Sequence, residues 1–381
     1  MKTLVEKKRG PAAIFALCPV RHALTALFAA VIALHVLLRG NRRLMVALSE
    51  RFVRPLHRAL ALVNSHVPFS AAEALIALAV VSVLGYLCVQ LVLLICRDGR
   101  AARLYRTAVT LLCAGLGVYA LFCLCWGVYY YADDFAVKSG FDSGAVSVEQ
   151  LESVTRYFAA LTNEYSSQVK RDDAGVCRSD RERILEKSKT LFEKTVGEYP
   201  FLDGPEVRAK GVVCSRVMSY IDFTGFFFPF TGEANVNIDS PECDFAATVA
   251  HELSHQRGVA KEQEANFVAV LASLRDGDPD YCYSACLLAY IHLSNALYAA
   301  DRDAWADIRS GLSDAVLCDL RYKREYWSAF ETPVQKASNT VYEGFLHSYD
   351  QTLGLRSYGA CVDLLVNYYY AAAERYLGEE R

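Results

Sequence analysis

The chain has 381 residues, of which 53% are hydrophobic, and it carries a formal net charge of −3. This composition is too apolar for a simple soluble domain, and the nearly neutral charge gives no sign of nucleic-acid binding. Arginine dominates the N-terminal third, whereas most acidic residues follow it. We therefore expect a membrane anchor followed by a globular domain.

Three apolar stretches predict transmembrane helices, at residues 11–38, 71–96 and 107–131. The third stretch ends in Trp126 and the run Tyr129–Tyr131, which are typical of the membrane–water interface. A signal peptide is an alternative for the first stretch, but its apolar core is long and no small-residue cleavage motif follows it. We interpret residues 1–131 as the anchor and 132–381 as one domain.

The orientation of the anchor follows from its basic residues. The positive-inside rule places two basic segments in the cytoplasm and hence the domain outside: the leader with Lys2, Lys7, Lys8 and Arg9, and the loop with Arg97, Arg100, Arg103 and Arg106. The loop 39–58 is also basic and lies on the opposite side. It is predicted to form an amphipathic helix on the bilayer, because apolar residues recur every four positions at Leu44, Leu48, Phe52 and Leu56.

One motif in the domain points to metal chemistry. His251-Glu252-x-x-His255 places two imidazoles on one face of a helix, where both can bind one metal ion. Glu252 can then reach a metal-bound water and take its proton as the water attacks a carbonyl. A helix with two surface histidines is the alternative for so short a motif.

The residues around this motif predict a well-bounded helix. Ser240 and Pro241 have the pattern of an N-cap and a first helical position. Three residues at four-residue spacing, Phe245, Val249 and Leu253, predict a buried stripe that the two histidines do not share. Gly258 is a natural helix stop because it can adopt the left-handed conformation.

A third ligand is expected just downstream. A continuous helix would carry Glu262 about 10 Å beyond His255 along the axis, so the chain must turn near Gly258 and start a second helix. Glu262 and Glu264 are two residues apart, about 200° around that helix, so both cannot face one metal ion. We predict Glu262 as the ligand and keep Glu264 as the alternative.

The segment Glu262-x-x-Ala-Asn266 resembles the third-ligand signature of gluzincin-type membrane metallopeptidases, which read Glu-x-x-Ala-Asp. The resemblance implies that Glu262 binds zinc and that Asn266 orients a ligand through a hydrogen bond. The gap after His255 is shorter than in most such families. It is closer to the metzincin spacing, whose third histidine falls on Lys261 here.

A longer match covers three segments: Phe228-Pro-Phe-Thr-Gly-Glu-Ala-Asn-Val-Asn237, His-Glu-Leu-Ser-His-Gln-Arg-Gly258, and Glu262-x-Glu-Ala-Asn-Phe267. Together they resemble an uncharacterised bacterial family of membrane-anchored proteins similar to zinc metallopeptidases. The resemblance implies transmembrane helices followed by one zincin-like domain.

The fold class is predicted as mainly α, with a small β-hairpin or edge sheet. The strand-like segments are Thr224–Phe230 and Glu233–Ile238. In zincins an edge strand above the metal helix binds extended substrate. The segment of Ala234, Asn235, Val236 and Asn237 either has that role or only packs the metal helix. Glu233 is interpreted as a residue on the surface side of a turn.

Other helices are predicted from their start signals. Capping boxes at Ser147–Gln150 and Ser179–Glu182 begin helices that reach about Lys170 and Val196, the second ended by Gly197. Asp278-Pro279 begins a helix through about Tyr298. Tyr283 and His292 on that helix are candidates, by residue type, for stabilising an oxyanion.

The thirteen cysteines include no CxxC pair, and most are interpreted as free buried thiols. The sequence thus predicts a zinc metallopeptidase of the bacterial cell membrane, with its domain outside and Zn²⁺ as cofactor. Its expected partners are a peptide or protein substrate and the lipid bilayer, and no nucleic acid. The alternatives are a non-catalytic sensor or scaffold that keeps the fold, and a metal hydrolase of a non-peptide substrate.

Overall fold

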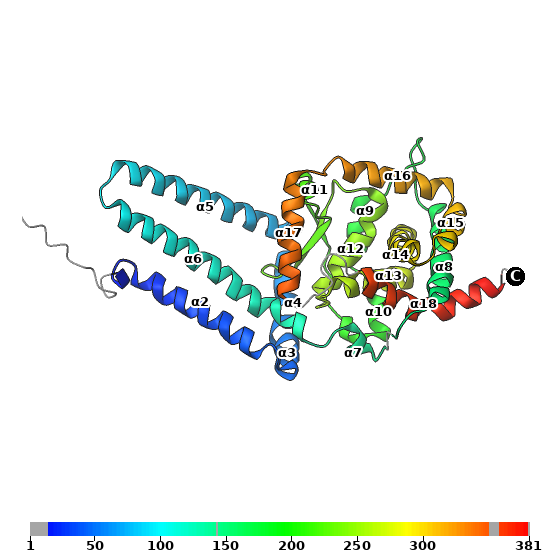
Figure 1. Ribbon diagram of the computed structural model, residues 1–381, viewed down its shortest axis with the longest axis horizontal. Helices are drawn as coiled ribbons and strands as arrows, with labels where there is room; N and C mark the ends of the chain where they lie inside the picture. Colours follow the sequence, from blue (N-terminus) through cyan, green and yellow to red (C-terminus); the bar gives the residue numbers. More distant parts are fainter. Residues whose placement is uncertain (1–13, 142–143, 350–357, 380–381) are drawn as a thin grey trace, which may run out of the picture.

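The computed structural model describes residues 14–141, 144–349 and 358–379. Figure 1 shows a globular domain and three long helices that project from one side of it. The basic leader with Lys2 and Arg9 lies outside the described residues, as do the first positions of the predicted first span.

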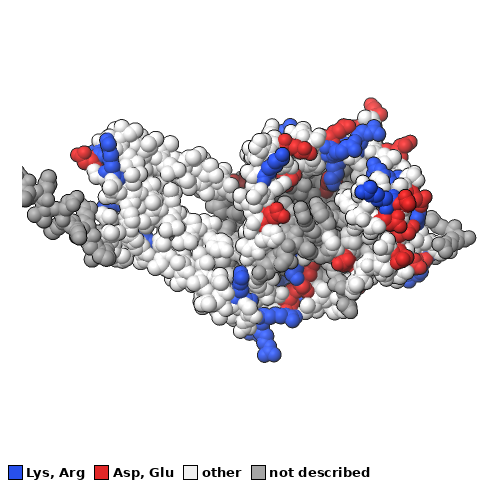
Figure 2. All heavy atoms as spheres, in the orientation of Figure 1, with Lys and Arg blue, Asp and Glu red and all other residues white. Residues whose placement is uncertain are grey.

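The three projecting helices are α2 (Pro19–Leu38), α5 (Ala71–Cys96) and α6 (Arg100–Cys125), and each is long and apolar enough to cross a membrane. The surfaces of these helices carry almost no charged side chains, whereas charged side chains lie at the helix ends and on the domain (Figure 2). The second span has the predicted bounds. The third prediction is wrong at both ends, because the helix starts at Arg100 and stops at Cys125.

The aromatic run after α6 is not an interface belt. It forms a short 3₁₀ helix, η2 (Gly127–Tyr131), and Trp126, Tyr129 and Tyr130 are only 7–8% exposed. Its buried neighbours include Met45, Val53 and Tyr349. Packing with these residues, rather than contact with lipid, therefore explains the aromatic run.

The basic loop between the first two spans is helical and packs on the domain. It comprises α3 (Arg42–Leu48), a π-helical segment η1 (Ser49–Val53) and α4 (Arg54–Asn64). The predicted apolar face is only partly free, since Phe52 is 67% and Leu56 43% exposed whereas Leu44 and Leu48 pack against the domain. Several arginines pair with carboxylates: Arg42 with Asp133, Arg54 with Glu50, and Arg58 with Asp203.

The start of α5 is fastened to the sheet of the domain. Glu233 is buried, contrary to the prediction of a surface position, and its carboxylate accepts hydrogen bonds from the backbone N–H groups of Ala71 and Ala72, at 3.2 and 2.8 Å. Lys210 pairs with the same carboxylate at 2.5 Å. The hydroxyl of Ser70 donates to Asn235 at 2.6 Å. The buried ion pair of Lys210 and Glu233 therefore holds the N-terminal end of a span. We call the contacts of Glu233, Lys210 and Asn235 with the start of α5 the α5 clasp.

The sheet has three short strands, β1 (Lys210–Val212), β2 (Gly225–Phe228) and β3 (Glu233–Asn237), in the order β1-β3-β2. The hairpin β2–β3 is antiparallel, with Phe226 opposite Asn235, and confirms the two predicted strands. The parallel strand β1 was not predicted. Because β3 is central and paired on both sides, the prediction that Ala234–Asn237 is an edge strand is wrong.

The remaining elements are helices that surround the buried core of the domain, with α14 packed against α8, α12, α13 and α18. Before the sheet lie α7 (Phe135–Ser139), α8 (Val148–Ser166), α9 (Arg181–Lys187), α10 (Glu193–Glu198) and the 3₁₀ helix η3 (Pro200–Leu202). Helix α11 (Ser215–Tyr220) lies between β1 and β2. After the sheet come α12 (Glu242–Gln256), α13 (Glu262–Asp276), α14 (Pro279–Ala300), α15 (Arg302–Ser310), α16 (Asp314–Ser328), α17 (Pro333–Ser348) and α18 (Tyr358–Glu379).

One predicted capping box is present and one is not. At Ser147 both reciprocal hydrogen bonds with Gln150 are made. At the second site Asp180, not Ser179, caps the helix, which ends at Lys187. Ser188 follows its last residue, donates its hydroxyl to the carbonyl of Leu185 and accepts the backbone N–H of Ala209. The later helix α10 contains Gly197 rather than ending before it.

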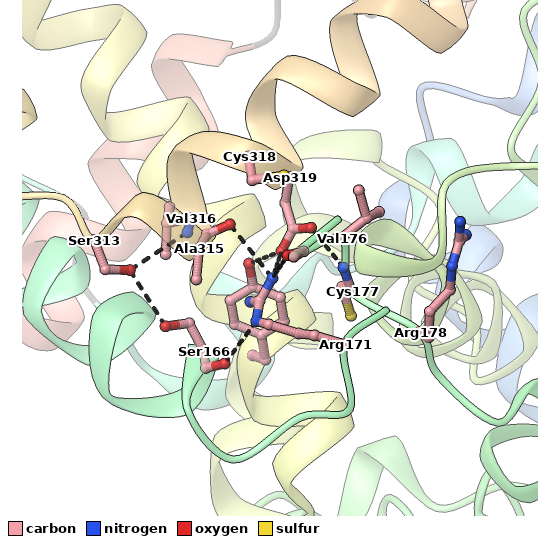
Figure 3. A network of polar contacts seen from close by, with 12 residues as sticks. Ser166, Arg171, Val176, Cys177, Arg178, Ser313, Ala315, Val316, Cys318 and Asp319 are labelled. Carbon is pink, nitrogen blue, oxygen red and sulfur yellow. Dashed lines mark hydrogen bonds and ion pairs between the residues drawn. The ribbon is translucent and has the colours of Figure 1, made fainter. Parts of the chain in front are cut away.

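A buried carboxylate joins the loop after α8 to α16 (Figure 3). Asp319 is fully buried and pairs with Arg171 at 2.9 Å, and it accepts the backbone N–H of Cys177 at 2.8 Å. The hydroxyl of Tyr283 donates a short hydrogen bond to it as well. In this Asp319 cluster both oxygens of the carboxylate have hydrogen-bond partners. The hydroxyl of Tyr283, which was a candidate for oxyanion binding, makes one of these hydrogen bonds instead.

Candidate metal centre

Helix α12 carries the HExxH motif through the middle of the domain. Phe245, Val249 and Leu253 are fully buried, which confirms the predicted stripe. The helix begins one residue later than predicted, with Pro241 at the N-cap, because the Ser240 hydroxyl donates to the carbonyl of Asn237. The strands β2 and β3 pack against this helix on one side, and α13 and α14 pack against it on others.

The turn at the end of α12 positions the second histidine. Gly258 has a φ of +87°, and the N–H groups of Gly258 and Val259 bond to the carbonyls of His255 and Ser254 in the pattern of a Schellman motif. The carbonyl of Val259 lies 2.6 Å from Nδ1 of His255. That hydrogen bond leaves Nε2 as the free ring nitrogen, and it points toward the first histidine.

The chain then reverses into α13, whose first residue is Glu262. Three atoms converge there: Nε2 of His251 and Nε2 of His255 are 3.0 Å apart, and Oε2 of Glu262 lies 3.2 and 3.7 Å from them. A tetrahedral zinc ion with bonds of about 2.0–2.1 Å separates its ligand atoms by about 3.3–3.4 Å. The triangle has the size that such an ion requires.

The donor set also fits zinc by its chemistry. Two imidazoles and one carboxylate are the ligands of many catalytic zinc sites, which keep a fourth position open. Two ring nitrogens facing each other at 3.0 Å repel unless a proton or cation lies between them. These three side chains therefore form a group that could hold a metal ion.

The two other candidates on α13 lie on opposite sides of it. Oδ1 of Asn266 is 2.8 Å from Nδ1 of His251, so this side chain fixes the ring of the first histidine. Glu264 points away from the centre and accepts the backbone N–H of Phe135 at 3.0 Å. It is only 5% exposed, so it is buried in the domain rather than part of the metal centre. Of the two glutamates, Glu262 faces the histidines.

Glu252 lies beside the three ligand atoms and is 3% exposed. Its Oε2 has no hydrogen-bond partner in the described part of the chain. Gly225 of β2 makes room for this carboxylate, because a Cβ added there would lie 2.6–2.9 Å from it. Strand β2 and helix α12 can approach closely only because residue 225 has no side chain.

Electrostatics at the centre favour a cation. Burial raises the pKa of Glu252 to about 7, near the range that suits a general base. Burial alone would lower the pKa of His255, but the Glu262 carboxylate outweighs it and raises that pKa to about 9. Burial would raise the pKa of Glu262, yet the two histidines hold it well below its usual range. The carboxylate and imidazoles thus stabilise positive charge between them.

Helix α17 covers the centre from the far end of the sequence. The hydroxyl of Tyr342 donates to Oε1 of Glu262 at 2.7 Å, leaving Oε2 for the histidines. The helix is held by Asp222, which accepts from Gln335 and Asn339 at 3.1 and 2.9 Å. Nothing in the sequence near Tyr342 marks it as part of the centre, since the contact joins residues 80 positions apart.

The metal centre opens into a cavity of about 440 Å³ whose walls are largely aromatic. The residues that line it include Phe122, Trp126, Tyr130, Phe223, Phe226, Phe227, Tyr342 and Phe345. The first three belong to the region predicted as the anchor. The predicted boundary between residues 131 and 132 therefore passes through the wall of the cavity.

A second cavity, of about 240 Å³, lies on the other side of the ligands and is lined by Thr224, Asp244, Asn266 and Lys323 among others. A larger one, of about 860 Å³, lies between α14, α15 and α16. It contains none of the candidate ligands, so its size does not make it the reactive site.

The predicted oxyanion residues are not at the centre. Tyr283 belongs to the Asp319 cluster, and His292 is buried on α14 outside the residues that line the 440 Å³ cavity. Burial lowers the pKa of His292 to about 4, so the ring is neutral near pH 7. The strand beside the ligands is β2, through Thr224, Gly225 and Phe226, rather than Ala234–Asn237.

Comparison with known proteins gives one match. No curated protein and no solved structure matches the chain. The family described as "Protein of unknown function (DUF3810)" matches residues 49–366, from η1 to α18, which is well over half of the sequence. The chain therefore belongs to the DUF3810 family.

Proposed function

We propose that this protein is a membrane-anchored zinc metallopeptidase. The observation that carries the proposal is the triangle of Nε2, Nε2 and Oε2 atoms, at 3.0–3.7 Å, from His251, His255 and Glu262. Oε2 of the buried Glu252 carboxylate lies directly beside it and has no hydrogen-bond partner in the described part of the chain. Ligands alone would suit a structural metal, whereas the added carboxylate suits hydrolysis.

Zinc bound to these ligands would supply an acidified water and a Lewis acid for a peptide carbonyl. Glu252 is placed to take the proton of the attacking water, because its carboxylate lies beside the three ligand atoms in the same cavity. The same carboxyl group then gives the proton to the leaving amine. Asn266 and the carbonyl of Val259 hold the two imidazoles in the orientation that aims Nε2 at the metal.

A peptide is favoured as substrate by the strand next to the centre. Strand β2 is an edge strand, because β3 pairs with it on one side and the sheet order places β2 last. Residues 224–227 line the cavity that contains Glu252. An extended peptide that pairs with this edge passes beside the ligands. A purely structural metal site has no use for such an edge.

The three spans support a membrane location, and the arginines at their two ends support a direction. At the domain end Arg42, Arg54 and Arg58 pair with carboxylates of the folded chain. At the other end Arg100 and Arg106 bind backbone carbonyls of Leu94 and Leu17 instead. Because this far end is a short loop rich in arginine, we place it in the cytoplasm and the domain outside the cell membrane.

The decisive experiment separates zinc binding from hydrolysis in the full-length protein in detergent. Zinc content is measured by mass spectrometry and hydrolysis with a peptide library. Glu252→Gln is expected to keep one zinc ion and to lose at least about 100-fold in rate, because general base catalysis contributes that much. His255→Ala is expected to lose both.

Glu264→Gln is the matched control, since it changes another buried glutamate twelve residues away without touching the ligands. It is expected to keep zinc and activity. If Glu252→Gln were as active as the wild type, the centre would not be a peptidase of this type, however well it bound zinc.

The orientation is tested by labelling intact cells. Asp173 lies in an exposed loop of the domain, and Asp173→Cys is treated with an impermeant maleimide. We expect labelling above the wild-type background before lysis. Labelling that requires lysis would place the domain in the cytoplasm.

A further inference from the structure

One wall of the metal cavity is built from a membrane span. Phe122 lies in the last turn of α6 and lines the cavity, followed by Trp126 and Tyr130. The ring of Trp126 contacts that of His255 edge-on, with 5.9 Å between centroids. The reactive centre is therefore only a few residues away from the apolar helix that enters the bilayer.

The opposite wall is packed onto the same span. Phe345 of α17 meets Phe122 edge-on at 5.4 Å, and Tyr349, just beyond α17, meets Phe122 at 5.7 Å. Tyr342, one turn earlier on α17, binds the ligand Glu262. The cavity thus lies where the span meets the domain, and eight aromatic side chains line it.

The side of the domain that faces the spans carries many exposed apolar side chains. Figure 1 shows α4, α11 and α17 on the side of the domain from which the spans project. Large apolar side chains of these elements and their flanks are exposed there: Phe52 67%, Leu62 47%, Val63 68%, Val213 79%, Val217 59%, Val334 58% and Val341 73%. Such apolar side chains suit the boundary between the lipid headgroups and the acyl chains rather than contact with water.

Hydrogen bonds fix the position of the domain relative to the start of α5. The α5 clasp ties the start of a span to β3, and Glu73 on the first turn of α5 accepts the N–H groups of Val213 and Cys214 at 2.9 and 2.7 Å. Strand β3 pairs in turn with β2 beside the centre. The cavity therefore cannot move far from the membrane without breaking buried hydrogen bonds.

We infer that the substrate is the juxtamembrane segment of a second membrane-anchored polypeptide, and this inference rests on the proposed peptidase function. One helical turn separates Phe122 from Trp126, about 6 Å, and a further ring contact of about 6 Å reaches His255. An extended chain covers this distance in roughly four residues at 3.3 Å each. The bond that is cut should lie within about ten residues of the membrane, with apolar side chains next to it.

The test uses the wild-type protein in liposomes with a library of reporters. Each reporter is a single transmembrane helix followed by a randomised segment of about 40 residues, which extends over 100 Å when stretched. The cut positions are mapped by mass spectrometry of the released peptides. The same randomised segment without the helix is offered in a parallel sample, and Glu252→Gln serves as the inactive control.

We expect the cuts to gather in the first quarter of the segment, next to the helix, and the anchored library to be cut at least about 10-fold faster than the free one. Cuts spread evenly along the segment, or equal rates for both libraries, would overturn the inference and leave the peptidase function intact. If zinc-loaded protein cuts neither library, the proposed function and this inference both fail.

Discussion

Two buried polar clusters of the domain, the Asp319 cluster and the metal centre, differ in one respect. In the Asp319 cluster the carboxylate is satisfied by an arginine, a tyrosine hydroxyl and a backbone N–H. At the metal centre the nitrogen atoms of His251 and His255 face each other, and Oε2 of Glu252 has no partner in the described part of the chain. Both clusters join segments that are far apart in sequence.

The difference shows how a buried polar cluster can be assigned to stability or to chemistry. In a closed cluster the carboxylate already makes the hydrogen bonds that burial demands, so it needs no further partner. An open cluster retains unsatisfied atoms that a ligand has to complete. Changes to the Asp319 cluster should therefore alter folding, and changes to the metal centre should alter zinc binding.

The largest effect is expected from removal of the third ligand. Glu262→Ala should weaken zinc binding about a thousandfold, since zinc sites contribute about 10–16 kcal/mol over three or four ligands. Competition with a chromophoric chelator measures the affinity. Glu264→Ala is the control and should bind zinc as the wild type does. Equal losses in both variants would show that the two glutamates cannot be distinguished as ligand and non-ligand.

The counterpart in the closed cluster is Asp319→Ala. Removing one partner of a buried ion pair leaves Arg171 uncompensated, and we expect the domain to lose about 3 kcal/mol of stability. That corresponds to a fall in Tm of roughly 10 °C for a domain of this size, measured by thermal unfolding in detergent. The zinc affinity of the folded fraction should not change. A zinc defect without a fall in Tm would contradict the comparison.

A smaller effect is expected from Asn266→Ala. The amide fixes Nδ1 of His251, and loss of such a partner typically weakens metal affinity about 10–100-fold. Asn266→Asp retains an acceptor oxygen at the same place and should restore most of the affinity. If both variants bound zinc equally well, the amide would have no part in orienting the ring.

The smallest effect is expected from Tyr342→Phe, which removes the hydroxyl that donates to Glu262. Because the Glu262 side chain is 26% exposed, water can replace that donor, and we expect about a fivefold loss of zinc affinity, or about 1 kcal/mol. Tyr283→Phe removes the equivalent donor from Asp319. It should lower Tm and leave zinc affinity unchanged, and the opposite pattern would reverse the assignment of the two clusters.

Local signals in the sequence were enough to predict the helices and the sequence-adjacent half of the centre. The spacing of His251 and His255, the left-handed Gly258 and the geometry of a helix that must turn led to Glu262, which faces the histidines as expected. These are short-range constraints. The bounds of α5 and α14 were predicted well for the same reason, because apolar length and Asp-Pro are local features.

Contacts between distant segments could not be predicted. The aromatic run after α6 was assigned to lipid because its composition fits an interface, whereas packing against η1 and the metal cavity explains it. Strand β1 has three residues, too few for a periodic pattern, and its pairing moved β3 from the edge to the centre. Tyr342 and Gly225 act through neighbours that are far away in sequence, so no local pattern marks them.

The α5 clasp links the position of the domain's sheet to the thickness of the bilayer. Helix α2 has 20 residues and α5 has 26, so their lengths are about 30 and 39 Å, against a hydrocarbon core of about 30 Å. The longer helix meets a thinner bilayer by tilting. Because Glu233 and Asn235 bind the start of α5, a change in the tilt of that helix acts on β3. Strand β3 pairs with β2, whose Gly225 lies against the Glu252 carboxylate. The tilt of the span is thus linked, through the clasp and the strand pair, to the position of Gly225 beside the proposed general base.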